Sequence, residues 1–133
     1  MRQKFSLTAS DAQKMAAACR DEAAKKGWPI IFAIVDDAGS LLHFERLDGT
    51  PNISVEIAIL KARTAAITRQ RSKAWEDRAT QFPVFLKFPQ ILPRQGGVPI
   101  LHEGDCIGAI GVSGRPDPAE DEYIADVGIA ALG

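Results

Sequence analysis

Residues 106–114, CIGAIGVSG, place three glycines within an apolar, β-branched stretch, and this combination narrows what the chain can fold into. A dinucleotide-binding turn needs G-x-G-x-x-G, and a phosphate-binding P-loop needs Gly-Lys-Ser/Thr. Here the spacing is G-x-x-G-x-x-G, and Arg115 follows Gly114. We therefore expect Gly108 and Gly111 to lie inside a strand. Because glycine weakens a strand, close approach of another backbone, a helix or a ligand must explain them, and packing is the favoured explanation.

Local signals divide the rest of the chain into helices and two hairpins. A capping box at Thr8 and Asp11 begins the first helix, and Gly27 ends it. Asp117 begins the last helix, with proline at the first helical position and Glu120 completing a second box. The expected helices are 9–26, 54–68, a short one that Ser72 caps and that ends near Thr80, and 118–132; the expected strands are 30–35, 41–47, 98–101 and 106–112.

Two hairpins with flanking helices predict an α+β fold, an antiparallel sheet covered by helices. We find no internal repeat and no linker composition, so residues 1–133 are expected to form a single domain. The segment 82–92 carries three phenylalanines between prolines, and we expect it to be packed against something.

Composition excludes several classes of function. Sixteen basic and 17 acidic residues give a net charge of −1, so neither nucleic acid nor an anionic membrane is an expected partner. No apolar run approaches the roughly 20 residues that cross a bilayer, and the first residues lack a signal-peptide pattern, which predicts a cytoplasmic protein. Cys19 and Cys106 lie far apart, outside any metal-binding spacing, and are expected to be buried thiols.

Lys61 is the most informative charged residue, because its helical neighbours three and four positions away are apolar or small. Its ammonium group must either extend to water or meet an anionic partner in a pocket. Arg46 could hold a carboxylate as a two-pronged donor, or form a surface ion pair with Glu45 or Asp48.

Glycines and hydroxyls suggest a pocket for an anion around Lys61. Gly96 and Gly97 form either a backbone nest for an anion or a sharp turn into a strand. Ser113, Gly114 and Arg115 lie where a helix N-terminus could help bind an anion. The expected ligand-binding residues are Arg46, Lys61, Thr64, Gly96, Gly97, Ser113 and Gly114. The catalytic candidates are Lys61, Asp121 and Glu122, of which the two carboxylates could act as acid or base or only complement the helix dipole.

Six motifs occur in an order that resembles a known family: IVDDAGSLL at 34–42, RLDG at 46–49, KARTAA at 61–66, GGVP at 96–99, GAIGVSG at 108–114 and DEYIA at 121–125. The chain resembles the GlcG/HbpS family of haem-degrading or haem-binding domains, and is similar to the C-terminal domain of PduO-type cobalamin adenosyltransferases. The resemblance covers nearly the whole chain. It implies a profilin-like antiparallel sheet sandwiched by helices, assembly into homo-oligomers, and haem as a cofactor in some members, with haem degradation proposed.

One departure from the family concerns the iron ligand. Some relatives bind haem through a histidine on the first helix, and this helix contains none; Met15 and Cys19 are its only soft ligands. His43 and His102, the only histidines, lack a spaced partner; each is either structural or the axial ligand of haem.

The leading hypothesis is therefore a small oligomeric protein that binds haem or a related tetrapyrrole. The alternative is an enzyme or sensor for a small aliphatic or aromatic carboxylate in a pocket around Lys61. A third possibility is a structural module that uses 82–92 as an interface.

Overall fold

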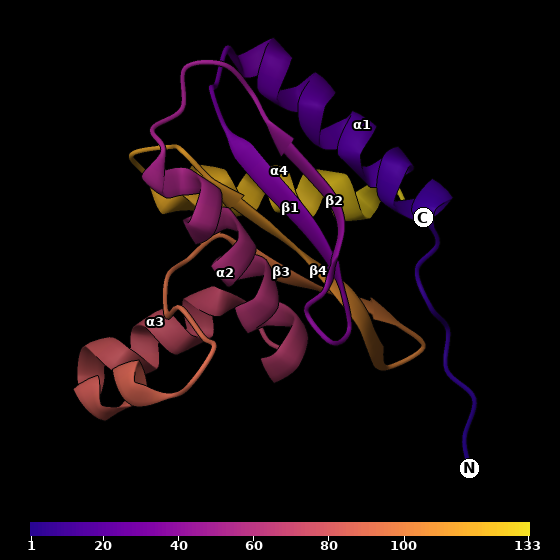
Figure 1. Cartoon of the computed structure of the whole chain (residues 1–133), viewed down its shortest axis with the longest axis vertical. Helices are drawn as coiled ribbons and strands as arrows, with labels where there is room; N and C mark the ends of the chain where they lie inside the picture. Colours follow the sequence, from indigo (N-terminus) through magenta and orange to yellow (C-terminus); the bar gives the residue numbers. More distant parts are fainter.

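The computed structural model describes residues 1–133, and its elements follow the expected order (Figure 1). The helices are α1 (Ala9–Lys26), α2 (Ile53–Thr68), α3 (Ser72–Gln81) and α4 (Pro118–Ala130), with a 3-10 turn, η1, at Pro83–Lys87. The strands are β1 (Ile31–Asp36), β2 (Leu41–Arg46), β3 (Gly97–His102) and β4 (Asp105–Ser113). The predicted α+β class and both hairpins are confirmed.

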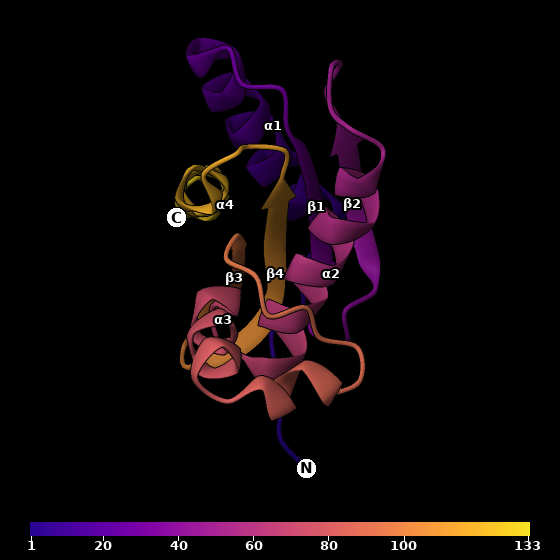
Figure 2. The same ribbon diagram turned by 90° about the vertical axis from the view of Figure 1, so that its left-hand side faces the viewer.

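The four strands form one antiparallel sheet in the order β2-β1-β4-β3. The two hairpins are joined in the centre, where β1 and β4 pair from Ile31 opposite Ser113 to Asp36 opposite Gly108. Figures 1 and 2 show α1 and α4 on one face of the sheet and α2 on the other. No helix of the chain is both long enough and apolar enough to span a bilayer.

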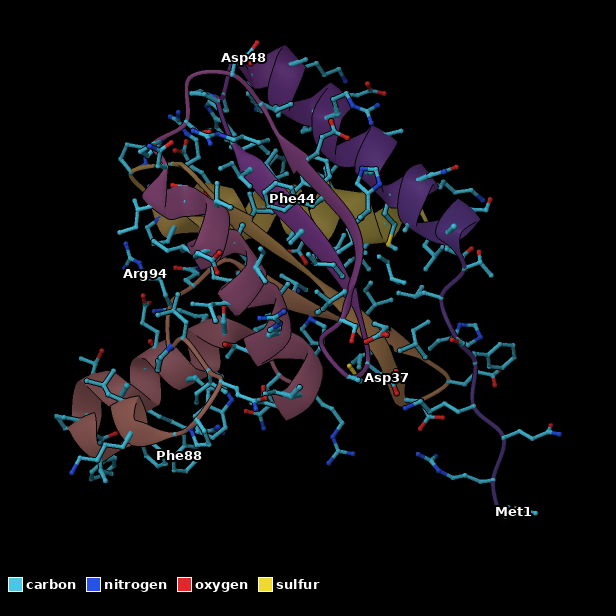
Figure 3. All side chains as sticks on the ribbon, viewed as in Figure 1. Met1, Asp37, Phe44, Asp48, Phe88 and Arg94 are labelled. Atoms are coloured by element: carbon cyan, nitrogen blue, oxygen red, sulfur yellow. The ribbon has the colours of Figure 1, made fainter.

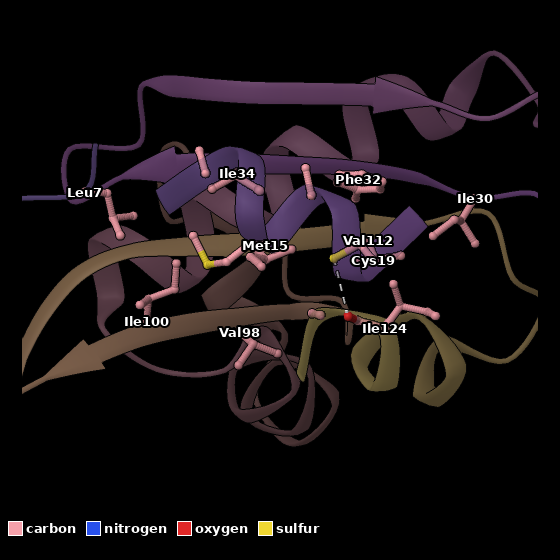
Figure 4. Close-up of a cluster of buried hydrophobic side chains, with 14 of the residues drawn as sticks. Leu7, Met15, Cys19, Ile30, Phe32, Ile34, Val98, Ile100, Val112 and Ile124 are labelled. Atoms are coloured by element: carbon pink, nitrogen blue, oxygen red, sulfur yellow. Dashed lines mark hydrogen bonds between the residues drawn. The ribbon is translucent and has the colours of Figure 1, made fainter. Parts of the chain in front are cut away.

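The larger hydrophobic core lies between the sheet and the pair α1 and α4 (Figure 4). Alternate residues of β1, among them Phe32 and Ile34, point into it, as alternation along a strand requires. Met15 and Cys19 of α1 are fully buried in this core, and the Cys19 thiol donates to the carbonyl of Ile124 over 3.6 Å. The prediction of two buried, unpaired cysteines is confirmed for Cys19 and Cys106.

The second face of the sheet is lined with small residues, and α2 packs on it very closely. Gly97 and Gly111 lie opposite each other on β3 and β4. A Cβ atom on Gly111 would overlap backbone atoms of Ala58 and Ala62, and one on Gly97 would overlap the carbonyl of Lys61. The glycine-rich segment is thus a strand under a helix, which confirms packing as the explanation for Gly111.

Helix ends agree with the local signals at most positions. Thr8 and Asp11 form the predicted capping box, and Asp117 accepts a hydrogen bond from the Ala119 N–H at the start of α4. Glu120 does not complete a second box there, because its carboxylate accepts from the Arg115 side chain.

Helix α3 and η1 project together at one corner of the molecule (Figures 1 and 2). Ser72 is the first residue of α3 and not its cap: its hydroxyl accepts a hydrogen bond from the Gly97 N–H over 2.8 Å. Trp75, Phe85 and Phe88 form an aromatic cluster whose ring centroids lie 5.3–5.6 Å apart. Figure 3 shows Phe88 at this corner.

Candidate functional site

A cavity of about 520 Å³ opens beside α2, between the start of α4 and the segment that links η1 to β3. Its volume lies within the range of small-molecule sites in proteins. Elements distant in sequence contribute to it, since α2, the η1 region and the β4–α4 connection meet here. Its lining consists of Pro51, Ser54, Ile57, Lys61, Leu86, Leu92, Pro93, Arg94, Ser113, Gly114, Arg115, Pro116 and Asp121.

Lys61 and Asp121 form a buried ion pair in the cavity wall. The Lys61 ammonium donates to Asp121 Oδ2 over 3.1 Å and to the Val112 carbonyl over 2.9 Å, and both side chains are 2% exposed. Asp121 Oδ1 accepts from the Arg115 N–H over 3.1 Å. Of the two expectations for Lys61, an anionic partner in a pocket is confirmed, and the partner belongs to the chain itself.

Burial governs the ionisation of this pair. Desolvation lowers the pKa of Lys61 from its ordinary value, and the Asp121 carboxylate opposes that shift. Desolvation likewise raises the pKa of Asp121, against the attraction of Lys61 and the Arg115 N–H. Each group therefore depends on the other to remain charged.

Two arginines add positive charge to the cavity wall. Arg94, which Figure 3 shows beside α2, donates to Glu76 over 3.0 Å. Arg115 donates to Glu120 over 3.2 Å, and its guanidinium lies 5.0 Å from the centroid of the Trp28 ring. Lys61, Arg94 and Arg115 thus line the cavity together with one carboxylate, that of Asp121.

Thr64, Gly96 and Gly97 do not line the cavity but contact residues that do. The Thr64 hydroxyl accepts from the Leu92 N–H over 2.7 Å and so holds the η1–β3 segment against α2. Gly96 has φ 134°, and a Cβ atom there would come within 2.7 Å of Lys61 Nζ and of the Val112 carbonyl. The Gly97 N–H donates to the Ser72 hydroxyl and so is not free to bind an anion, while the missing side chain at Gly96 leaves room for the lysine.

Other predicted site residues lie outside this cavity. Arg46 donates to Thr50 and Asn52 and so fixes the β2–α2 connection, with no ion pair to Glu45 or Asp48. Glu122 follows Asp121 on α4 but pairs with Arg71 over 3.4 Å, and its Oε2 is buried without a hydrogen-bond partner.

The two histidines lie on opposite edge strands of the sheet. His43 on β2 is half-buried, 3.1 Å from Glu45, and stacks on Phe32. His102 on β3 is exposed, with its ring 4.5 Å from that of Phe5, and borders a groove of about 260 Å³ lined mainly by apolar side chains. No group of three His, Cys, Asp or Glu side chains could hold a metal ion.

Sequence analysis did not select Arg94, and it noted Arg115 only within the stretch 113–115 before the last helix, not as a ligand-binding residue. Arg94 lies in the proline-broken stretch, where no periodic pattern indicates which way a side chain points. For Arg115, the signal in the sequence was its position between Gly114 and Asp117, the residue that caps α4.

Comparisons with known proteins agree on one family. A model of the family described as haem-degrading protein HbpS-like matches residues 7–130. Protein GlcG of Escherichia coli K12 is 37% identical over 114 residues, which cover 85% of each chain. A crystal structure of a double mutant of Streptomyces reticuli HbpS has a TM-score of 0.93 at 34% identity, covering 100% of this chain and 91% of that one. The structure of a PduOC–haem complex has a TM-score of 0.86 at 25% identity, covering 96% and 95%.

Proposed function

The chain belongs to the HbpS-like family, and from that premise we propose that it binds haem or a related tetrapyrrole. The observation that carries the proposal is the likeness of nearly the whole chain to a protein solved with haem. The family description names haem degradation, which would be a further activity of a chain that binds haem.

The residues of this chain differ in how well they suit haem. The Lys61 cavity contains no His, Cys, Met or Tyr, so it offers the iron no strong ligand. On α1, Met15 and Cys19 are fully buried in the core and cannot reach a bound group. His102 suits the iron better, because its imidazole is exposed beside an apolar groove and can supply an axial ligand.

A haemin titration followed in the Soret region tests this proposal. We expect a saturable one-to-one spectral change that His102→Ala weakens and that His43→Ala, the matched control on the other edge strand, leaves in place. A featureless titration would exclude haem binding. Equal spectra for all three proteins would show that His102 is not the ligand.

We also propose that the protein forms a homo-oligomer, as the resemblance implies. Support comes from the α3–η1 corner, which exposes large apolar side chains that a monomer would leave in water. These are Phe82, Val84, Leu86 and Phe88. Light scattering of the wild type and of Val84→Glu checks this: a monomeric wild type contradicts it.

The second candidate function is binding of a small carboxylic acid in the cavity around Lys61. The specific observation is the charge of its lining, three cationic side chains against one carboxylate. A thermal-shift screen of aliphatic and aromatic acids tests it, with Arg94→Gln as the variant that loses any stabilisation. The absence of stabilisation by every acid would exclude this candidate.

A further inference from the structure

The Lys61 ammonium has one hydrogen that the protein does not use. An ammonium group donates three hydrogen bonds. Two go to Val112 and Asp121, and no third acceptor lies within hydrogen-bond distance in the chain. The side chain is only 2% exposed, and it lines the cavity. A buried donor of this kind requires an acceptor.

Asp121 restricts what that acceptor can be. Its Oδ2 lies 3.1 Å from Lys61 Nζ, so a second carboxylate on the same ammonium would sit close to a buried negative charge. Two carboxylates that share a site repel each other strongly in a poorly solvated environment. An uncharged oxygen, from a carbonyl or a hydroxyl group, meets the third hydrogen without that repulsion.

The charged end of a ligand then fits the arginines. Arg94 and Arg115 each have five N–H donors, and each gives only one to a neighbouring carboxylate side chain. Arg94 is 51% exposed, so it can turn toward a ligand with little desolvation. The side chains of Ile57, Leu86 and Leu92 line the same cavity and offer an apolar wall for a carbon skeleton.

We propose that the cavity recognises an oxygenated carboxylic acid, with its uncharged oxygen on Lys61 and its carboxylate on Arg94 or Arg115. This inference rests on the second candidate function, and it adds that a carboxylate alone is not enough. Gly96 is required for this site, because a Cβ atom there would come within 2.7 Å of Lys61 Nζ and crowd the ammonium group.

Three acids with one carbon skeleton test the inference by isothermal titration calorimetry: phenylpyruvate, phenyllactate and hydrocinnamate, which carry a carbonyl, a hydroxyl and neither. A hydrogen bond to a charged group predicts that the better of the first two binds about tenfold to hundredfold more tightly than hydrocinnamate. Equal affinity of all three overturns the inference but leaves the carboxylate pocket in place. No binding by any of them overturns both.

Variants assign the two contacts separately. One of the two variants Arg94→Gln and Arg115→Gln is expected to weaken all three acids by a similar factor, and unchanged affinity in both contradicts the carboxylate contact. Arg20→Gln should change none, because Arg20 on α1 is 46% exposed, pairs with Glu45 of β2 and does not line the cavity. Lys61→Met with Asp121→Leu removes both buried charges and should abolish the preference for the oxygenated acids. A preference that survives in this folded double variant contradicts the assignment of Lys61.

Discussion

Removing one member of the buried pair should destabilise the fold severely. In Lys61→Met, Asp121 loses its only cationic side-chain partner within hydrogen-bond distance while staying 2% exposed, and the Val112 carbonyl loses a donor. Breaking a buried ion pair on one side costs about 3–5 kcal/mol. Since a domain of this size is stable by about 5–15 kcal/mol, the variant should lose a large part of its free energy of unfolding.

Urea unfolding followed by tryptophan fluorescence measures this loss, and a double-mutant cycle isolates the pair. Lys61→Met/Asp121→Leu removes both charges, so we expect it to recover most of the stability that Lys61→Met loses, to within about 1–2 kcal/mol of wild type. A loss below about 1 kcal/mol in Lys61→Met would refute the reasoning. So would a double variant no more stable than the single one, since the cost would then come from packing and not from an unpaired charge.

Three further outcomes follow from the geometry. Gly111→Ala should cost at least about 1–3 kcal/mol in urea unfolding, because its Cβ would overlap the backbone of α2; an unchanged midpoint would contradict the close packing. Cys19, whose pKa burial raises to about 12, should not react with iodoacetamide at neutral pH until the protein unfolds, as mass spectrometry of native and denatured samples would show. Burial raises the pKa of Asp121 above 3.8, so the folded state keeps the carboxyl proton to higher pH than the unfolded state does. The stability of wild type relative to Asp121→Asn should therefore fall as the pH rises above about 4. A constant or rising stability difference in thermal denaturation would contradict the direction of the pKa shift.

Local signals predicted most of the fold because they act within a few residues. The Thr8 capping box and Gly27 define α1 to the residue, and the β1–β2 hairpin follows from an apolar run, a turn and a return strand. Ser72 shows where such reasoning ends. Its hydroxyl would cap a helix by the local pattern, but Gly97, 25 residues further on, supplies a donor that occupies it.

The site was predictable only in its parts. A lysine among small residues on a helix face indicated a buried or partnered ammonium, and Asp121 was a candidate for separate reasons. Nothing in the sequence joined the two across 60 residues. Arg46 was predicted to line the same pocket, but it lies outside the cavity. Its guanidinium donates to Thr50 and Asn52, which are close in sequence, and it contacts no group of the site.

The glycines and the lysine belong to one arrangement. The missing side chains at Gly97 and Gly111 let the backbone of α2 lie directly on β3 and β4. That contact brings Lys61 close enough to reach the Val112 carbonyl at the end of β4 and Asp121 on α4, which packs on the opposite face of the sheet. A larger residue at either glycine would push α2 outward and separate Lys61 from its two acceptors. Gly97 and Gly111 therefore act through packing, and this packing places a buried ammonium at the edge of the cavity.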